Sequence, residues 1–163
     1  MGLNVVLYQP LIPSNTGNIA RTCAGTRTSL HLIRPLGFST DDKALKRAGL
    51  DYWEFVDIHY YDSLEEFFEK HPNGEFFYLT KHGKKPHSDF NYSDMSKDYF
   101  FVFGRETTGL PPELLEANAD HCLRLPMSPF IRSLNLSNTA AIMIYEALRQ
   151  QGYPELFLDE NDL

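Results

Sequence analysis

The feature that most limits how this chain can fold is a regular alternation of short apolar runs with helix-like segments along nearly its whole length. Apolar runs of about four to eight residues, bounded by turn residues, are typical of buried strands. Strands that alternate with helices form a parallel sheet, because each crossover helix returns the chain to the same edge. The sequence therefore predicts an α/β fold in which helices cover both faces of a parallel sheet.

Six runs are predicted to be strands, and residues 81–98 are predicted to form a polar loop. The strands are expected at residues 3–8, 29–36, 52–61, 75–80, 99–104 and 121–126. Helices are expected at residues 19–24, 41–49, 63–71, 111–119 and 133–152.

Capping residues support two of these helices. Ser63 and Glu66 have the spacing of a capping box, and Gly152 is placed to end the last helix before a proline. The buried face of that last helix is predicted from helical spacing to hold an apolar set, namely Leu134, Ala141, Ile142, Tyr145 and Leu148.

The length of 163 residues fits one domain with an ordinary core. No repeat or linker divides it, so we expect a single domain over residues 1–155 and a solvated acidic tail over residues 156–163. No apolar run approaches the roughly 20 residues that span a bilayer. The N-terminus has no basic region before its apolar stretch, so we do not expect a secretory signal. The protein is expected to be cytoplasmic.

Metal and disulfide chemistry have little support. Cys23 and Cys122 do not form a CxxC pair and are expected to be small buried residues. The six histidines show no metal-binding spacing, so no metal is expected.

Net charge restricts the way in which the chain could bind a nucleic acid. The 22 acidic residues outnumber the 15 lysines and arginines, which gives a net charge of −7. Binding to RNA would therefore need a local basic patch. Arg21, Arg132 and the loop lysines Lys81, Lys84 and Lys85 are the candidates, although a plain solvated surface explains the lysines equally well.

Ligands of parallel α/β proteins bind at the carboxyl ends of the strands. Here those ends lead into residues 15–21, 79–81, 104–109 and 125–135. These four segments are predicted to be loops that surround the site.

Three motifs fall in the predicted site. NTGNIAR carries Asn15 and Arg21 and suits an anion or a ribose, or else it is simply a capped helix start. FGRETTGL carries Gly104 and Glu106. It is either a plain glycine turn or a functional loop in which Glu106 binds backbone or substrate hydroxyls. RSLNLSNTAA has more polar residues than one helix cap requires.

In this order, PSNTGNIAR, FGRETTGL and RSLNLSNTAA resemble the three motifs of the SpoU branch of the SPOUT methyltransferases, over nearly the whole chain. The closer resemblance is to the YibK-like group, the tRNA (cytidine(34)-2'-O)-methyltransferases. Segments that carry it are NVVLYQPLIPSNTGNIARTCA, RPLGFSTDDKALKRAGLDYWE and SLNLSNTAAIMIYEALRQ.

The resemblance implies a C-terminal trefoil knot and a homodimer whose active site takes residues from both subunits. It implies S-adenosylmethionine as cofactor and the anticodon stem-loop of tRNA as substrate, methylated on the ribose of cytidine or modified uridine 34. Four positions would meet the cofactor: Leu79, Gly104, Leu125 and Ser133. Four more are candidates for contact with the RNA: Asn15, Glu106, Arg132 and Asn135.

Arg21 matches the proposed catalytic residue of that family. A guanidinium with a pKa above ~12 is hardly ever deprotonated in a protein, so orienting the 2'-hydroxyl is its expected role rather than acting as a base. Phe130 and Tyr145 are candidates for stacking on bases.

Other readings stay open. The chain could be an RNA-binding relative without activity, or a 2'-O-methyltransferase for another RNA site; an enzyme for ribosomal RNA would be expected to carry an added N-terminal RNA-binding domain. A nucleotide-dependent oxidoreductase is disfavoured, because no GxGxxG fingerprint is present.

Overall fold

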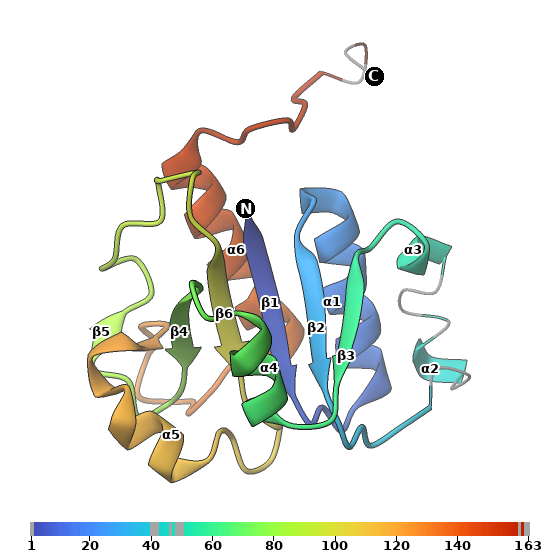
Figure 1. Cartoon of the computed structure of the whole chain (residues 1–163). Helices are drawn as coiled ribbons and strands as arrows, with labels where there is room; N and C mark the ends of the chain where they lie inside the picture. The colour runs from blue at the N-terminus through green and yellow to red at the C-terminus, as the bar shows by residue number, and fades with distance from the viewer. Residues whose placement is uncertain (1, 40–42, 46, 48–50, 160, 162–163) are drawn as a thin grey trace.

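A seven-stranded parallel sheet forms the centre of the molecule (Figure 1). The computed structural model describes residues 2–39, 43–45, 47, 51–159 and 161. The strand order is β3-β2-β1-β6-β4-β7-β5, and every pair of neighbours is parallel. The predicted α/β class and parallel sheet are thereby confirmed.

The strands are β1 (Leu3–Tyr8), β2 (Ser29–Ile33), β3 (Ile58–Tyr61), β4 (Glu75–Leu79), β5 (Lys85–Pro86), β6 (Tyr99–Phe103) and β7 (Cys122–Arg124). The helices are α1 (Pro13–Thr26), α2 (Lys43–Leu45), α3 (Asp51–Trp53), α4 (Leu64–Lys70), α5 (Pro112–Ala117) and α6 (Leu136–Gln151), with a 3-10 turn at Ala119–His121. None of the described helices is long and apolar enough to cross a bilayer.

The two faces of the sheet carry separate apolar clusters, because successive side chains of a strand point to opposite faces. Val5 and Phe101 pack with α1 and α6, whereas Val6 and Phe100 pack with α4. Figure 1 shows α4 in front of the sheet and α1 and α6 behind it. Both cysteines are buried as predicted, and burial raises the pKa of the Cys23 thiol.

Three sequence-based assignments were wrong. The segment from Asn15 to Arg21 is helical rather than a loop, because Pro13 at the first helical position starts α1 early. Residues 52–61 hold the helical turn α3 before β3, so only the second half of that run is a strand. The predicted polar loop contains the two-residue β5, a seventh strand. Of the predicted helix at residues 41–49, only α2 and residue 47 lie among the described residues.

The buried face of α6 also differs from the prediction. Its buried residues are Ala140, Met143, Ile144, Ala147 and Leu148. Ile142 and Tyr145 are 39% and 48% exposed, and Leu134 precedes the helix. Helical spacing alone does not distinguish two adjacent faces of this helix. Contacts with α1 and the sheet decide which of them is buried. The caps were predicted correctly: the hydroxyl of Ser63 accepts from the Glu66 amide, and Gly152 ends α6 with a φ of 77°.

A chain of hydrogen-bonded polar side chains runs along the α4 face of the sheet, from Asn4 near the start of β1 to Tyr61 at the end of β3. The Asn4 amide donates to the Gly2 and Tyr99 carbonyls, so its oxygen faces His31 Nε2 at 2.9 Å and requires a proton there. The Tyr61 hydroxyl then donates to His31 Nδ1 and accepts from His71 Nε2, both at 2.9 Å. Burial, with His59 and His71 nearby, lowers the pKa of His31 from 6.5 to about 3.

We expect the protein to lose stability as pH falls below about 6.5, because the unfolded chain then binds a proton at His31 that the folded chain does not. The loss extends down to the folded-state pKa of about 3, and it amounts to roughly 2 kcal/mol at about pH 5. Urea unfolding at about pH 7.5 and about pH 5 measures it. The difference between the two pH values should shrink in His31→Gln and persist in His82→Gln, whose imidazole is exposed; an unchanged difference in His31→Gln contradicts the assignment.

Candidate active site

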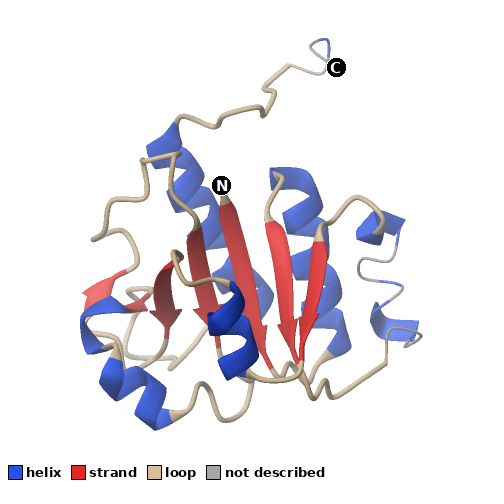
Figure 2. Cartoon of the chain, viewed as in Figure 1, coloured by secondary structure: helices blue, strands red, loops and turns tan. Residues whose placement is uncertain are grey.

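A pocket of about 600 Å³ lies at the carboxyl ends of the central strands. Figure 2 shows the loops of this end below the arrowheads of the sheet. The pocket is lined by the segments that follow β4, β6 and β7 and by the starts of α1 and α6. Its volume falls in the range of small-molecule and cofactor sites.

Hydrogen bonds join the three sequence motifs beside this pocket. The Glu106 carboxylate accepts from the Ile12 amide at 2.6 Å, from the Leu11 amide at 3.0 Å and from Asn15 Nδ2 at 3.4 Å. Asn15 is 5% exposed, and its Oδ1 accepts from Asn135 Nδ2 at 3.0 Å. Asn135 also caps α6 through the Ser137 amide. Glu106 thus fixes the N-terminal end of α1, where a negative charge is favourable.

The loop after β6 folds back on itself. The amides and carbonyls of Arg105 and Gly109 bond each other at 2.9 and 3.2 Å, and Gly109 has a φ of 72°. A Cβ at Gly104 would lie 2.3 Å from the Gly109 carbonyl carbon, so this position requires glycine. The tight loop aims Glu106 at the start of α1 and leaves Thr107 and Thr108 on the wall of the pocket.

The charge of the pocket is opposite to that of the chain. Its described lining includes Lys81, Arg105, Arg124 and Arg132 but one acidic side chain, Glu106, which is already bonded to N–H groups. Arg124 also donates to the carbonyls of Lys81 and Arg132 at 3.3 and 3.4 Å, and so connects two loops of the mouth. A local basic surface therefore exists in a chain of net charge −7.

Most of the predicted site residues meet in this pocket. Its lining includes all four residues predicted to meet the cofactor (Leu79, Gly104, Leu125, Ser133) and all four candidates for the RNA (Asn15, Glu106, Arg132, Asn135). Glu106, Asn15 and Asn135 bond backbone and one another, so the structure gives them a scaffolding role. Lys84 and Lys85 are exposed outside the described lining.

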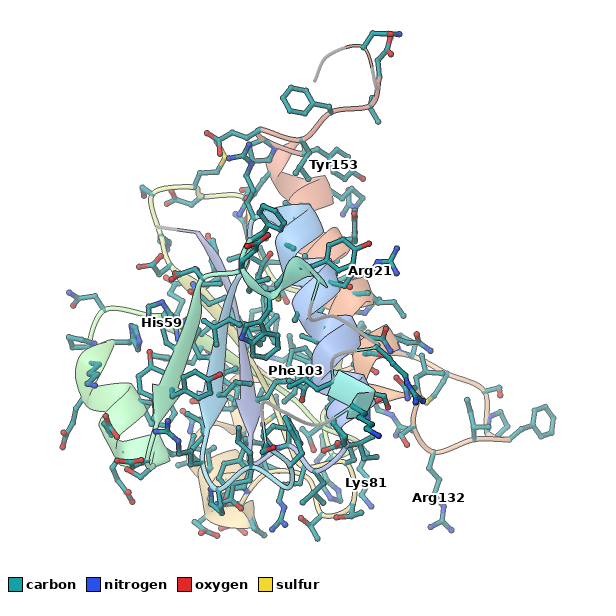
Figure 3. The ribbon with its side chains drawn as sticks, turned by 90° about the vertical axis from the view of Figure 1, so that its right-hand side faces the viewer. Arg21, His59, Lys81, Phe103, Arg132 and Tyr153 are labelled. Carbon is teal, nitrogen blue, oxygen red and sulfur yellow. The ribbon has the colours of Figure 1, made fainter. Side chains whose placement is uncertain are left out.

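Arg21 is not among the described residues that line the pocket. It lies on an exposed part of α1, with its guanidinium 5.0 Å from the centre of the Tyr52 ring. Figure 3 shows Arg21 well away from Lys81 and Arg132, which lie together toward the end of the molecule that carries the pocket. A single chain therefore does not bring the predicted catalytic residue to the predicted cofactor residues.

Sequence reasoning missed several lining residues, above all Arg105 and Arg124. Arg105 stands inside the motif FGRETTGL, next to a residue that was singled out. Arg124 was assigned to a strand only, although it is the last residue of β7, where the carboxyl-end rule applies. Among the described residues, no group of three histidine, cysteine, aspartate or glutamate side chains is arranged to hold a metal ion.

Replacing Glu106 by Gln is expected to lower the free energy of unfolding by about 2 kcal/mol. The neutral glutamine oxygen is a weaker acceptor than a carboxylate, and the glutamine NH2 group would face backbone amides that are themselves donors. Chemical denaturation measures the change. Glu116→Gln, at an exposed glutamate of α5, is the control and should stay within about 0.5 kcal/mol of the unaltered protein. Equal stability of the two variants would show that the Glu106 bonds are unimportant.

A parallel α/β sheet with apolar and cationic side chains around a pocket at its strand ends has the architecture of a ligand-binding α/β protein, and the cations suit an anion beside the ligand. The sequence comparison makes this class specific. The chain belongs to the SpoU rRNA Methylase family, whose sequence profile matches residues 2–145.

Individual relatives match over nearly their full length. A Bacillus subtilis protein with the provisional name tRNA (cytidine(34)-2'-O)-methyltransferase is 69% identical, over 96% of this chain and 98% of its own. The tRNA (cytidine(34)-2'-O)-methyltransferase of Escherichia coli K12 is 49% identical, over 93% of this chain and 96% of its own. A solved structure that addresses the 2-OH methylation of C/U34 on tRNA has a TM-score of 0.85 and 42% identity, over 92% and 96% of the two chains.

Proposed function

We propose that this protein is an S-adenosylmethionine-dependent methyltransferase that methylates the ribose 2'-hydroxyl of nucleotide 34 in tRNA, a cytidine or a modified uridine. The observation that carries the proposal is the pocket at the strand ends, where all three family motifs meet under a basic rim. Relatives named for this activity at 49% and 69% identity support it.

The residues of the pocket fit the proposed cofactor. Buried leucines, among them Leu79, Leu123 and Leu125, supply apolar surface for a purine. Backbone carbonyls and amides at the strand ends and the hydroxyl of Ser133 supply polar contacts, and the glycine loop allows close approach. When bound, S-adenosylmethionine supplies a methyl group on a positively charged sulfur, and this sulfur keeps the electron pair when the bond between sulfur and methyl breaks.

The chain's own residues bind and orient the reactants. A cofactor held by the pocket would give its methyl group to the ribose 2'-oxygen, and the hydroxyl would release its proton to solvent. Holding donor and acceptor in line lowers the barrier by about 7 kcal/mol. Lys81, Arg124 and Arg132 bind the RNA backbone at the mouth, and the bonds of Glu106, Asn15 and Asn135 keep the walls in place.

Arg21 reaches the pocket only if a second copy of the chain supplies it, and we propose that the protein acts as a homodimer. Arg21 lies over the exposed ring of Tyr52 on α3, and α6, which packs on α1, exposes Ile142 and Tyr145. Since α1 and α6 pack side by side, these residues form a surface suited to a second copy. Arg21 of one copy then orients the 2'-hydroxyl over the pocket of the other.

Mixing two inactive variants tests this arrangement. Ser133→Trp is expected to fill the pocket, and Arg21→Ala removes the guanidinium. In a mixed dimer one pocket is intact and faces an intact Arg21, so a randomised mixture should recover about a quarter of the unaltered activity. No recovery, with mixed dimers verified by light scattering and mass spectrometry, would place Arg21 in its own chain's pocket.

Methyl transfer to bulk tRNA tests the reaction itself. Labelled S-adenosylmethionine should give 2'-O-methylated nucleoside at position 34 of tRNA from a strain without the activity, detected by nucleoside mass spectrometry. Label at another RNA position would keep the enzyme class and change the substrate. Cofactor binding with no transfer would favour an inactive RNA-binding relative. Because tRNA is the proposed substrate, we place the protein in the cytoplasm.

A further inference from the structure

The loop between β7 and α6 presents a bare aromatic side chain. Phe130 is 90% exposed and its neighbour Ile131 is 48% exposed. Phe130 makes no ring contact with the described aromatic side chains, and it stands at a turn. Exposure alone does not identify a partner surface, so the position of Phe130 relative to the pocket decides its interpretation.

The same loop forms one wall of the pocket. Met127 precedes Phe130 and Arg132 follows it, and both line the pocket. The main chain is held at its base, since Arg124 donates to the Arg132 carbonyl at 3.4 Å. Pro126 and Pro129 restrict the backbone on the approach to the turn, which lowers the ordering cost of binding. The backbone that carries Phe130 is therefore restricted, and it lies beside the pocket.

The charges around this loop indicate which kind of partner covers it. Arg132, Arg124 and Lys81 make this mouth cationic, although the chain as a whole is acidic. A polyanion whose bases can leave their stack satisfies both the cations and the aromatic ring, because every base offers a face for stacking. By contrast, Tyr145 lies on α6 outside the described lining of the pocket.

We propose that Phe130 stacks on an unpaired base next to the reacting nucleotide and so holds the anticodon loop over the pocket. This inference rests on the proposed function, whose substrate recognition it specifies. Arg132 binds the phosphate of the same strand, and the ring fixes the orientation of the neighbouring base. Phe130 is thus an RNA-binding residue rather than part of the cofactor pocket.

Steady-state methylation of an anticodon stem-loop RNA tests the proposal. Phe130→Ala should raise KM for the RNA about 10-fold, with kcat within about twofold and unchanged affinity for S-adenosylmethionine. Phe130→Trp should restore a KM close to that of the unaltered protein. Phe157→Ala, at a 55% exposed phenylalanine of the C-terminal tail, is the matched control and should leave KM unchanged.

A fluorescent 2-aminopurine beside the reacting nucleotide separates this inference from the proposed function. Its emission should be quenched on binding the unaltered protein and Phe130→Trp, but not Phe130→Ala. An unchanged KM and quenching in Phe130→Ala overturn the proposal, and so does a shift of that variant to a smaller oligomer, which would assign Phe130 to a contact between copies. If the unaltered protein quenches the probe but methylates no RNA, the proposed function fails while the stacking stands.

Discussion

Replacement of Arg21 by lysine is expected to lower kcat about 100-fold or more while the affinity for S-adenosylmethionine stays unchanged. Lysine keeps the charge but loses the planar fork of donors that fixes a hydroxyl and a phosphate together. Arg21 lies outside the cofactor pocket of its own chain, so its loss leaves that pocket intact. Steady-state methyl transfer and calorimetric titration with the cofactor measure the two quantities.

Arg149→Lys is the matched control, because Arg149 is an exposed arginine in the last turn of α6 and pairs with Glu146 at 2.9 Å. It should keep the activity of the unaltered protein. Near-normal turnover in Arg21→Lys would mean that positive charge alone suffices, and the orienting role would then be wrong. A loss of cofactor affinity in the same variant would place Arg21 in the cofactor site instead.

Replacement of Gly104 by alanine is expected to weaken cofactor binding about 10- to 100-fold and to lower the unfolding free energy by about 2 kcal/mol. The added Cβ would lie 2.3 Å from the Gly109 carbonyl carbon and 2.4 Å from the Leu110 nitrogen, both of which are backbone atoms. The loop after β6 must then move, and it takes Glu106 with it. Cofactor titration and thermal unfolding measure the two effects.

The same substitution at Gly25 provides the control. Gly25 lies in α1, and a Cβ there would meet no other atom within 4 Å. Gly25→Ala should keep cofactor affinity and stabilise the protein by about 0.5 kcal/mol, since alanine is the better helix former. If Gly104→Ala binds the cofactor as tightly as Gly25→Ala does, the close approach at Gly104 is not needed for the site.

The layers of the fold could be predicted because buried parallel strands such as β1 and β6 are almost entirely apolar. The ends of the helices and strands were harder to predict. The segment that contains Pro13 and Gly17 has the composition of a loop, yet it forms the start of α1, because proline at the first helical position favours a helix. On the buried face of α6 the prediction was right for Leu148 and wrong for Ile142 and Tyr145, because contacts with α1, rather than spacing alone, decide that face. The trefoil knot stays a prediction of the family resemblance.

The membership of the site was more predictable than its internal contacts. The rule that ligands bind at the carboxyl ends of parallel strands predicted that Leu79, Gly104 and Leu125, which lie far apart in sequence, share one pocket, as they do. The contact with backbone that the sequence allowed for Glu106 is confirmed at the Leu11 and Ile12 amides. The bonds of Glu106 and Asn135 to Asn15 were not predicted, because such pairing depends on side-chain geometry in three dimensions. Nor did the rule predict that Arg21 would face away from the pocket of its own chain.

The most direct test of the central claim compares two anticodon stem-loop RNAs that differ in one atom, a 2'-hydroxyl or a 2'-hydrogen on the ribose of nucleotide 34. With labelled S-adenosylmethionine, we expect transfer to the RNA that carries the hydroxyl, and mass spectrometry should find the methyl on that ribose. The 2'-deoxy RNA should bind but gain no label. Equal labelling of the two RNAs would contradict 2'-O-methylation of nucleotide 34 as the function of this protein.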